Sequence, residues 1–440
     1  MHGTKPGKRS DHVAQVYDKQ MFIFGGWNPF YDRNAKTQIE RLNTAKIYND
    51  VWSLDLLHYT WKKIKTSDIK PSGRDSLAST VHKNQLVIFG GWLGNDLSNA
   101  TGSVMQHGGA EGAVHLPSGE AWALDLNTYV WKKLGKKTVG AVPPGRFWPS
   151  IVAHNDKMYM YGGGKGSAGK DLDTITWVLD FNTDAWTRVK TTGPVTARQA
   201  HSAVIYNDNM VIWGGFNYEG DKAEKTSLSD IWSLDLITYV WKELPSTNVP
   251  LKFGQSALDG LPTVYNSKII SVMGMYGLGY ENDGENHNEV YTYDLVTFEW
   301  RQLETSSPKP VPRGMCHPVL YDGKVVMFGG NINLKGEPFD YWPLPAIDDV
   351  LTLDLIPQRA FYQKLIDNQR PLNISCSAGK NDHTWSIIDT SILILLLLLS
   401  ICGGGFYFSR NGSRPRKPWK HSVTELLLPT VGNSRQSAEC

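Results

Sequence analysis

LVIFGGW (86–92) is an apolar run that ends in two glycines and an aromatic residue, and similar segments recur along the chain. The diglycine allows the backbone to leave a strand with unusual angles and to pack closely against its neighbours. The other five copies are FIFGGW (22–27), MYMYGGG (158–164), VIWGGF (211–216), SVMGMYG (271–277) and VMFGGN (326–331). The diglycines are Gly25 and Gly26, Gly90 and Gly91, Gly162 and Gly163, Gly214 and Gly215, and Gly329 and Gly330, whereas the fifth copy has Met273 and Gly274.

A second run, ending in aspartate, follows each diglycine. The six copies are DVWSLDL (50–56), EAWALDL (120–126), ITWVLDF (175–181), DIWSLDL (230–236), EVYTYDL (289–295) and DVLTLDL (349–355). Alternating apolar and polar residues, many of them β-branched or aromatic, favour a strand over a helix. Six residues beyond the aspartate, five copies carry a tryptophan: Trp61, Trp131, Trp186, Trp241 and Trp300.

These motifs predict four strands in each repeat, with one strand before the diglycine strand and one that holds the tryptophan. The aspartates lie 55 to 70 residues apart, which is too long for helical solenoid repeats. Four-stranded sheets repeated radially form a β-propeller, in which the tryptophan covers the sheet face between blades. The predicted fold class is therefore all-β, a six-bladed propeller. A content of 16 tryptophans and 42 glycines fits such a repeated β unit.

The sequence resembles the Kelch repeat family over about residues 9–366. The resemblance rests on the diglycine after an apolar strand, the aromatic residue beyond it and the tryptophan of the outer strand. The sixth copy lacks that tryptophan and has Ala360 and Phe361 there, so AFYQKLI (360–366) is expected to supply its last strand.

The two faces of the propeller are expected to differ. Connections between first and second strands are short, as in YDKQ (17–20), whereas those between second and third strands are long, as from Gly26 to Asp50. We call the face with the long connections the long-loop face and the opposite one the turn face. Long loops on a rigid scaffold commonly bind ligands. The candidate aromatic binding residues are Trp27, Trp92, Tyr218, Tyr276, Tyr280 and Trp342. For Trp27 and Trp92, packing at the loop base is an equal alternative.

An arginine precedes the first strand in five repeats, on the long-loop face: Arg9, Arg74, Arg146, Arg198 and Arg313. Arginines around one channel could hold a carboxylate through paired hydrogen bonds. In some Kelch proteins, arginines at this position contact acidic peptides or a terminal carboxylate, so the resemblance implies Arg74, Arg146, Arg198 and Arg313 as ligand-binding residues. The favoured alternative is that each arginine pairs with an acid of a neighbouring blade and holds the ring together.

Enzyme functions have little support in the sequence. Its four cysteines are scattered and match no metal-binding spacing, and no phosphate loop or GxSxG motif is present. Neither a catalytic residue nor a metal nor another cofactor is therefore expected, although a propeller oxidase remains the weakest alternative. With 45 basic against 43 acidic residues, the chain has no global positive field, which disfavours nucleic acid as a partner.

An uncharged apolar run, residues 390–408, predicts a transmembrane helix. Five arginines and lysines follow it by residue 420, so the positive-inside rule places the tail in the cytosol and the propeller outside or in a lumen. No signal peptide is visible at the start of the sequence, which leaves this orientation open. The expected organisation is a propeller (9–366), a stalk (367–389), a single span (390–408) and a disordered basic tail (409–440).

The function expected from these features is a membrane-tethered protein-interaction module, receptor-like or scaffolding, that binds through the long-loop face. Its expected partner is a protein or peptide, with a carboxylate as the sharpest possibility. The alternative is a tail-anchored adaptor that faces the cytosol and recruits substrates to a ubiquitin ligase or a trafficking complex.

Overall fold

Each of the six repeats folds into an antiparallel sheet whose strands follow one another in sequence order. Blade one contains β1 (Ser10–Tyr17), β2 (Gln20–Asn28), β4 (Val51–Asp55) and β5 (Trp61–Ile64), and β3 (Lys46–Ile47) pairs with β2. Blade two contains β7 (Ala78–His82), β8 (Gln85–Phe89), β10 (Ala121–Asp125) and β11 (Trp131–Leu134). Blade three contains β12 (Ser150–His154), β13 (Lys157–Tyr161), β14 (Thr176–Asp180) and β15 (Ala185–Val189).

The second half of the ring repeats this order. Blade four contains β16 (Ser202–Tyr206), β17 (Asn209–Trp213), β20 (Ile231–Asp235) and β21 (Trp241–Glu243). Blade five contains β22 (Gly260–Tyr265), β23 (Lys268–Tyr276), β24 (Glu285–Asp294) and β25 (Trp300–Leu303). Blade six has three described strands, β26 (Val319–Tyr321), β27 (Lys324–Phe328) and β28 (Val350–Asp354). Two short ribbons, β6 (Arg74–Asp75) with β9 (Trp92–Leu93) and β18 (Phe216–Tyr218) with β19 (Lys225–Ser227), extend blades two and four.

This computed structural model describes residues 4–28, 46–93, 117–136, 141–165, 171–218, 225–250, 260–276, 285–303, 311–332 and 346–355, and the pairs 373–374 and 385–386. Met1–Gln358 form one compact unit and Arg359–Cys440 a second. The described part of the second unit is the strand pair β29 (Asn373–Ile374) and β30 (Trp385–Ser386). The expected closing strand in 360–366, the span and the tail lie outside the described residues. Within those residues, no helix is long and apolar enough to cross a membrane.

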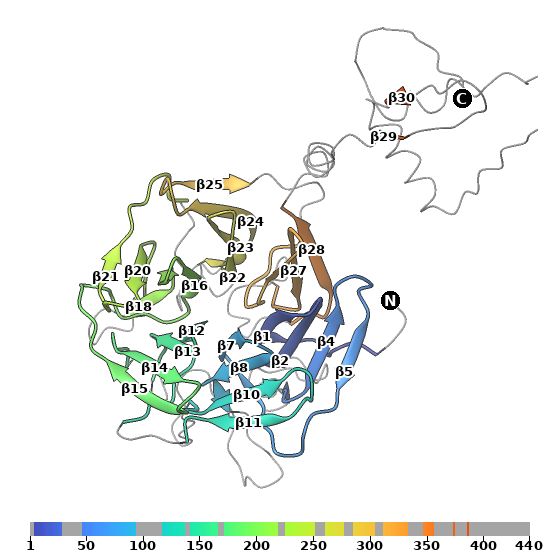
Figure 1. Cartoon of the computed structure of the whole chain (residues 1–440), viewed down its shortest axis with the longest axis horizontal. Helices are drawn as coiled ribbons and strands as arrows, with labels where there is room; N and C mark the ends of the chain where they lie inside the picture. Colours follow the sequence, from blue (N-terminus) through green and yellow to red (C-terminus); the bar gives the residue numbers. More distant parts are fainter. Residues whose placement is uncertain are drawn as a thin grey trace, which may run out of the picture. The chain divides into compact units, whose positions relative to one another are not determined.

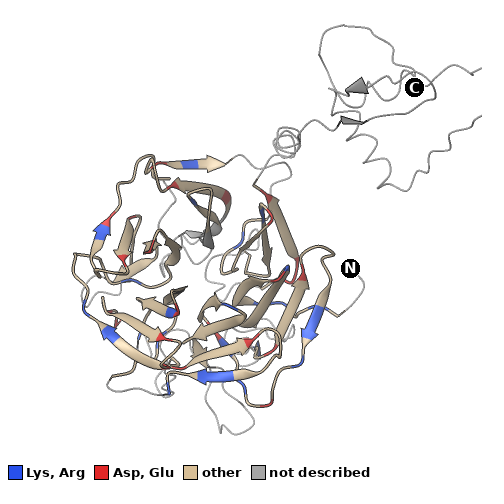
Figure 2. Ribbon diagram, in the orientation of Figure 1, with Lys and Arg blue, Asp and Glu red and all other residues tan. Residues whose placement is uncertain are grey.

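The first unit is a closed ring of six blades (Figure 1). The first strand of each blade lies at the centre, where each contacts its two neighbours, and β26 contacts β1 to complete the circle. The tryptophan-bearing strands β5, β11, β15, β21 and β25 lie at the outside, where they carry lysines and arginines (Figure 2). Charged residues on such edge strands discourage edge-to-edge pairing with other chains.

The core is divided among the seams between blades. Each of the six buried apolar clusters combines residues of two neighbouring blades. One of them joins blades six and one and so closes the ring. Four of the repeat tryptophans pack against an aromatic residue of the preceding blade's second strand, as predicted. The ring centroids are 5.1 Å apart for Phe24 and Trp131, 5.6 Å for Phe89 and Trp186, 4.9 Å for Tyr161 and Trp241, and 4.9 Å for Phe328 and Trp61.

Tight turns occupy the turn face. Five of the first-to-second connections have two consecutive residues with positive φ, as at Asp18 and Lys19, which is the geometry of the turns that suit twisted hairpins. The repeated aspartate closes the other connection, because Oδ1 of Asp55 accepts hydrogen bonds from the backbone N–H groups of Leu57 and His58 at 2.8 Å. The same pattern is found at Asp125, Asp180, Asp235 and Asp294.

The degraded fifth diglycine coincides with an irregular blade. In blade five the pairing of β23 with β24 shifts register between Val272 and Gly274, and both strands then continue to Tyr276 and Glu285. In blades one, two, three, four and six, both glycines have positive φ. The substitution therefore changes one blade locally and leaves the ring intact.

Candidate functional site

The five repeat arginines occupy equivalent, buried positions on the long-loop face. Their exposed fractions are 0–2%. In each case Nη1 donates a hydrogen bond to the carbonyl oxygen of the first glycine of the same blade's diglycine, which lies 16 residues further on. The pairs are Arg9 with Gly25 (3.1 Å), Arg74 with Gly90 (3.2 Å), Arg146 with Gly162 (2.9 Å), Arg198 with Gly214 (3.2 Å) and Arg313 with Gly329 (3.3 Å).

An acid at the start of the third strand neutralises most of these arginines. Arg198 makes two hydrogen bonds to Asp230, of 2.7 and 2.8 Å. Burial alone would raise the pKa of Asp230, but the hydrogen bonds and charge of Arg198 lower it below its usual value. Asp50, Glu120 and Asp349 pair in the same way with Arg9, Arg74 and Arg313. The acid belongs to the same blade, whereas the structural alternative from the sequence had placed it in a neighbouring blade.

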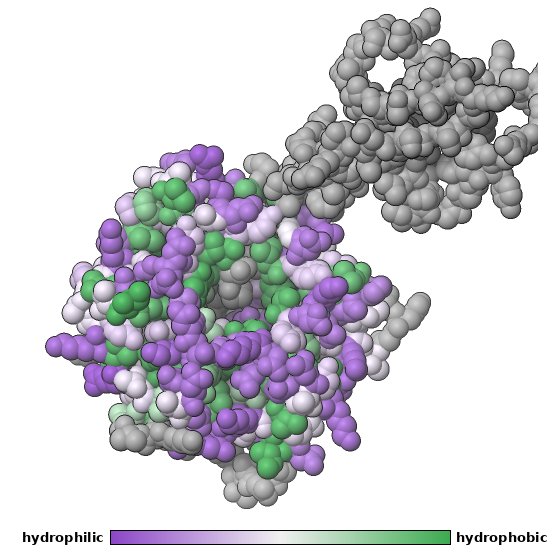
Figure 3. Space-filling model, in the orientation of Figure 1, coloured by the Kyte–Doolittle hydropathy of each residue, from purple (hydrophilic) through white to green (hydrophobic). Residues whose placement is uncertain are grey.

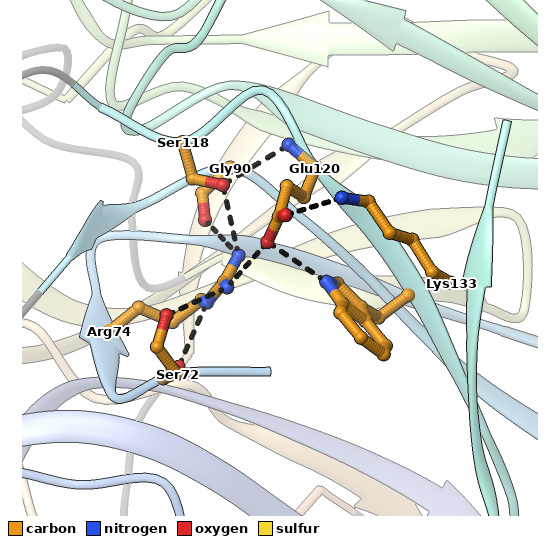
Figure 4. A network of polar contacts seen from close by, with 7 residues as sticks. Ser72, Arg74, Gly90, Ser118, Glu120 and Lys133 are labelled. Atoms are coloured by element: carbon orange, nitrogen blue, oxygen red, sulfur yellow. Dashed lines mark hydrogen bonds and ion pairs between the residues drawn. The ribbon is translucent and has the colours of Figure 1, made fainter. Parts of the chain in front are cut away.

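Blade two shows how completely such an arginine is surrounded (Figure 4). Arg74 donates to Ser72, to the Gly90 carbonyl, to Ser118 and to Glu120. Glu120 also accepts a 2.6 Å hydrogen bond from Lys133 and one from the indole of Trp122. Burial works against ionisation of Glu120, yet these donors lower its pKa to about 2. Glu120 is therefore a fixed negative charge that holds the guanidinium in place.

The arginine backbone, in contrast, joins neighbouring blades. The carbonyl oxygen of Arg198 accepts a 2.9 Å hydrogen bond from the backbone N–H of Gly163 in blade three. A Cβ on Gly162 would lie only 2.3 Å from that oxygen, so a side chain there would separate the blades. The same approach joins Arg146 to Gly90 and Gly91, and Arg9 to Gly329 and Gly330. Arg9, Arg146 and Arg198 thus tie their own blades with their side chains and the preceding blades with their main chains.

Arg146 is the exception among these arginines. Ile175 occupies the position of the acid in blade three. The nearest carboxylate is that of Asp173, whose Oδ1 lies 3.5 Å from Nη1, and Lys165 also contacts Asp173 at 2.9 Å. Nη2 of Arg146 is buried and has no hydrogen-bond partner among the described residues. Nη2 of Arg146 therefore remains available to an acceptor, whereas Nη2 of Arg198 already donates to Asp230.

The candidate aromatic residues lie in different settings. Trp27 is 2% exposed, and its indole donates a 3.0 Å hydrogen bond to Asp11, so it packs at the loop base as the alternative supposed. Trp92 is partly exposed on the β6–β9 ribbon and stacks on Phe147 at 4.5 Å. Tyr218 is partly exposed at the end of β18. Only the backbone of Tyr276 is described, and Tyr280 and Trp342 lie outside the described residues.

The structure places two buried acids at the long-loop end of the central channel, and the sequence analysis did not single them out. Asp11 in β1 is 4% exposed and Asp75 in β6 is 0% exposed. Asp11 accepts hydrogen bonds from Ser10, from Trp27 and, across blade two, from the Trp148 indole at 3.3 Å. Ser76 donates a 2.8 Å hydrogen bond to Oδ1 of Asp75 and also interacts with Asp11. The Ser76 side chain therefore lies near both carboxyl groups.

Burial changes the acidity of both carboxyl groups. It raises the pKa of Asp11 to about 6, although its hydrogen bonds oppose the shift. Burial, followed by the charge of Asp11, raises the pKa of Asp75 well above its usual value. Oδ2 of Asp75 is buried and accepts no hydrogen bond from the described part of the chain. These two groups carry charge less readily than Asp50, Glu120 and Asp230, whose pKa values are lowered.

A chain of backbone hydrogen bonds fixes this end of the channel. The N–H of Asp11 donates to Met315, that of Ser76 to Asp11, that of Trp148 to Ser76 and that of Ala200 to Trp148. All five residues have positive φ and belong to the segment just after the repeat arginine. Blades six, one, two, three and four are thereby linked in succession. Figure 3 shows the hollow that the ring encloses.

The described residues include no group of three or more His, Cys, Asp or Glu that could hold a metal ion. His12 and His201 are buried and His317 is partly buried, and removal from water lowers the pKa of each. Cys316 is buried, and its Sγ lies 3.9 Å from the sulfur of Met327. Ser150 and His201 form a 2.7 Å hydrogen bond in the seam between blades three and four.

Comparison with known proteins gives consistent relatives. The family model described as the KLHDC2/KLHL20/DRC7 Kelch-repeats domain matches residues 1–163 and 97–330. Kelch domain-containing protein 10 of Rattus norvegicus is 26% identical over 283 residues, which cover 55% of this chain and 66% of the rat protein. Kelch domain-containing protein 3 of Bos taurus is 25% identical over 392 residues, 86% of this chain and 92% of the bovine one.

A solved structure agrees with the ring observed here. The structure of YjhT matches 80% of this chain and 96% of its own length, with a TM-score of 0.53 at 14% identity. At that identity the likeness concerns the fold alone. The chain spans 66% of the rat relative named above, so the activities of that whole protein do not transfer directly.

Proposed function

The chain belongs to the Kelch-repeat family, and from that membership we propose that its propeller is a protein-interaction module that binds through the long-loop face. The observation that carries the proposal is the pair of ribbons β6–β9 and β18–β19, which lie at this face and hold Trp92 and Tyr218 partly exposed. Aromatic side chains on a rigid frame are typical anchors of protein interfaces. The proposal includes no enzymatic step.

Site-specific photocrosslinking in cells tests this choice of face. A photoreactive amino acid replaces Tyr218 in the full chain, and the matched control carries it at Ile237, which is 77% exposed on the turn face. We expect a discrete crosslinked partner from position 218 and none from position 237. Trp92→Ala should then weaken that crosslink while the chain keeps its cooperative unfolding transition. Crosslinks from position 237 alone would assign binding to the turn face.

Within this function, we propose that a carboxylate of the partner is held by Arg146. Support comes from its unused Nη2, whereas Arg198 has both terminal nitrogens on Asp230. Arg146→Lys keeps the charge and loses the fork that binds a carboxylate in bidentate fashion. We expect this variant to bind a partner peptide with a free carboxyl end no better than the amidated peptide. An undiminished preference for the free acid in Arg146→Lys would contradict the assignment.

We further propose that the module is tethered to a membrane by residues 390–408, with the tail in the cytosol. Support comes from the uncharged apolar run and from the arginines and lysines that follow it. Protease protection of the membrane-inserted chain, with a tag after Cys440, tests the topology. We expect a protected propeller and an accessible tag. An accessible propeller would instead support a cytosol-facing adaptor.

A further inference from the structure

The long-loop end of the channel holds unneutralised acid beside neutralised arginine. Four repeat arginines pair with an acid of their own blade. Asp11 and Asp75, in contrast, have no arginine or lysine partner among the described residues, and their side-chain hydrogen-bond donors are neutral hydroxyl and indole groups. The acidic groups left without a counter-charge at this end of the ring are therefore these two carboxyl groups, and a bound cation would stabilise their ionised form.

Two buried carboxyl groups without a cation are costly to the fold. A carboxylate removed from water destabilises the native state unless it is paired, and the cost grows when a second carboxylate lies nearby. Oδ2 of Asp75 has not even a neutral donor within the described residues, although it is fully buried. Groups that cost stability in this way commonly serve binding or catalysis, because natural sites retain residues that destabilise the fold.

The surroundings of these acids suit an organic cation. The indoles of Trp27 and Trp148 donate to Asp11, so their rings lie beside the carboxyl pair. Carboxylates accept charge-assisted hydrogen bonds from the N–H groups of ammonium and guanidinium ions. Calcium ions require six to eight oxygen ligands, far more than these two carboxyl groups and two serine hydroxyls offer in common.

We propose that Asp75 and Asp11 form a binding site for a cationic side chain, arginine or lysine, of the protein partner. The proposal rests on the interaction function proposed above and adds the chemistry of one anchor. The cation takes Oδ2 of Asp75 as its first acceptor. It enters beside Trp148, which is only partly buried and whose 3.3 Å hydrogen bond is the longest that Asp11 accepts. This anchor is separate from Arg146, which takes the opposite charge.

Titration calorimetry on the full purified chain tests the site with a small probe. The probe is N-acetyl-arginine amide, and N-acetyl-citrulline amide is the control because it has nearly the same shape without the charge. We expect heat of binding from the arginine probe and none from citrulline. Asp75→Asn should weaken binding by about tenfold or more, since charge-assisted hydrogen bonds are lost. Asp18→Asn, on the turn face, should bind as the unmodified chain does.

The outcomes separate this inference from the wider function. Equal binding of arginine and citrulline probes, no binding of either, or unchanged binding in Asp75→Asn would each overturn the cation site. If the crosslink at position 218 persists in that case, the interaction function stands without it. If arginine binds through Asp75 while position 218 captures no partner, the cation site stands and the proposed binding face is wrong.

Discussion

Asp75 has a fully buried carboxyl group whose pKa is raised by burial and by Asp11. The native state therefore holds a proton that the unfolded chain, with a pKa near 3.8, releases. The Asp75 carboxyl group therefore costs the fold nothing at a pH below this unfolded-state pKa. As the pH rises above it, the free energy of unfolding falls. Each unit by which the pKa is raised corresponds to about 1.4 kcal/mol. We predict that Asp75→Asn is more stable than the unmodified chain at neutral pH, with a margin that shrinks toward pH 4.

Chemical denaturation of both proteins across this pH range measures the margin. The difference between the two proteins removes the contribution of the buried histidines, which both share. Asn keeps Oδ1 as an acceptor for Ser76, so that hydroxyl contact is retained. A margin that stays constant with pH, or that favours the unmodified chain at neutral pH, would show that Asp75 is not held protonated by the fold.

Arg198 has a guanidinium that is fully buried and bonded to Asp230 and to the Gly214 carbonyl. Replacing it with alanine leaves a partly buried carboxylate and a buried carbonyl without their donor. Removing one partner of a buried ion pair lowers the free energy of unfolding by about 3–5 kcal/mol. We predict that Arg198→Ala lowers the free energy of unfolding by this amount, and a denaturant titration measures the change.

Arg301 is the matched control for this prediction, since it also pairs with a single acid, Glu299, but its side chain is 72% exposed. Arg301→Ala should cost less than about 1 kcal/mol, because exposed pairs contribute little. Similar costs for the two variants would mean that burial of the arginine network is not what stabilises the ring.

Trp131 shows how one strand serves two blades. Its strand, β11, belongs to blade two, and its side chain packs in the seam with blade one. The indole is 4% exposed and packs against Phe24, and its N–H has no hydrogen-bond partner among the described residues. Its contribution is therefore packing. We predict that Trp131→Ala lowers the free energy of unfolding by about 3–5 kcal/mol.

The neighbouring residue supplies the control for this seam. Val130 is 51% exposed in the turn before β11, so Val130→Ala should change stability by less than about 0.5 kcal/mol. Both variants can be compared in the same denaturant titration. If Trp131→Ala lowered the free energy of unfolding as little as Val130→Ala, packing in the seam could not explain why this tryptophan repeats.

The repeated tryptophan and diglycine predicted the elements well because each acts through local, periodic chemistry. Five blades use a diglycine with positive φ, as at Gly90, and five repeats use a tryptophan that covers the neighbouring sheet face, so the pattern recurs in the sequence. The partner of each arginine was harder to predict. The acid that pairs with Arg198 is Asp230, and only its place two residues before a tryptophan or at the start of DIWSLDL could have indicated it.

The acid pair at the channel end belongs to the scale of the whole molecule. Asp11 and Asp75 come from different blades and Trp148 from a third, and although all three closely follow a repeat arginine, the residue types there differ from blade to blade and give no recurring pattern. In the sequence, Asp11 stands near Arg9 and Asp75 beside Arg74, which suggests ordinary ion pairs. Closure of the ring changes this, because the arginine side chains turn toward the diglycines of their own blades and leave the acids at the channel.

Ring closure makes one seam different from the others, since blades six and one meet without a covalent link between consecutive strands. Phe328 of β27 and Phe89 of β8 occupy the same position before their diglycines, both are 0% exposed, and each faces a repeat tryptophan. Either change to alanine should cost about 3–5 kcal/mol in global stability. Phe89 lies in a seam whose two blades are consecutive in the chain, whereas Phe328 lies in the seam that joins its ends.

We therefore predict that the two variants differ in how they open. Phe328→Ala should lose native-state hydrogen-exchange protection first in β1 and β26, because opening this seam separates the ends of the ring and leaves the other seams intact. Phe89→Ala should lose protection evenly around the ring, since blades two and three stay connected through their shared loop. Early exchange of β7 and β12 in Phe89→Ala, as rapid as that of β1 and β26 in Phe328→Ala, would show that the closing seam is no weaker than an internal one.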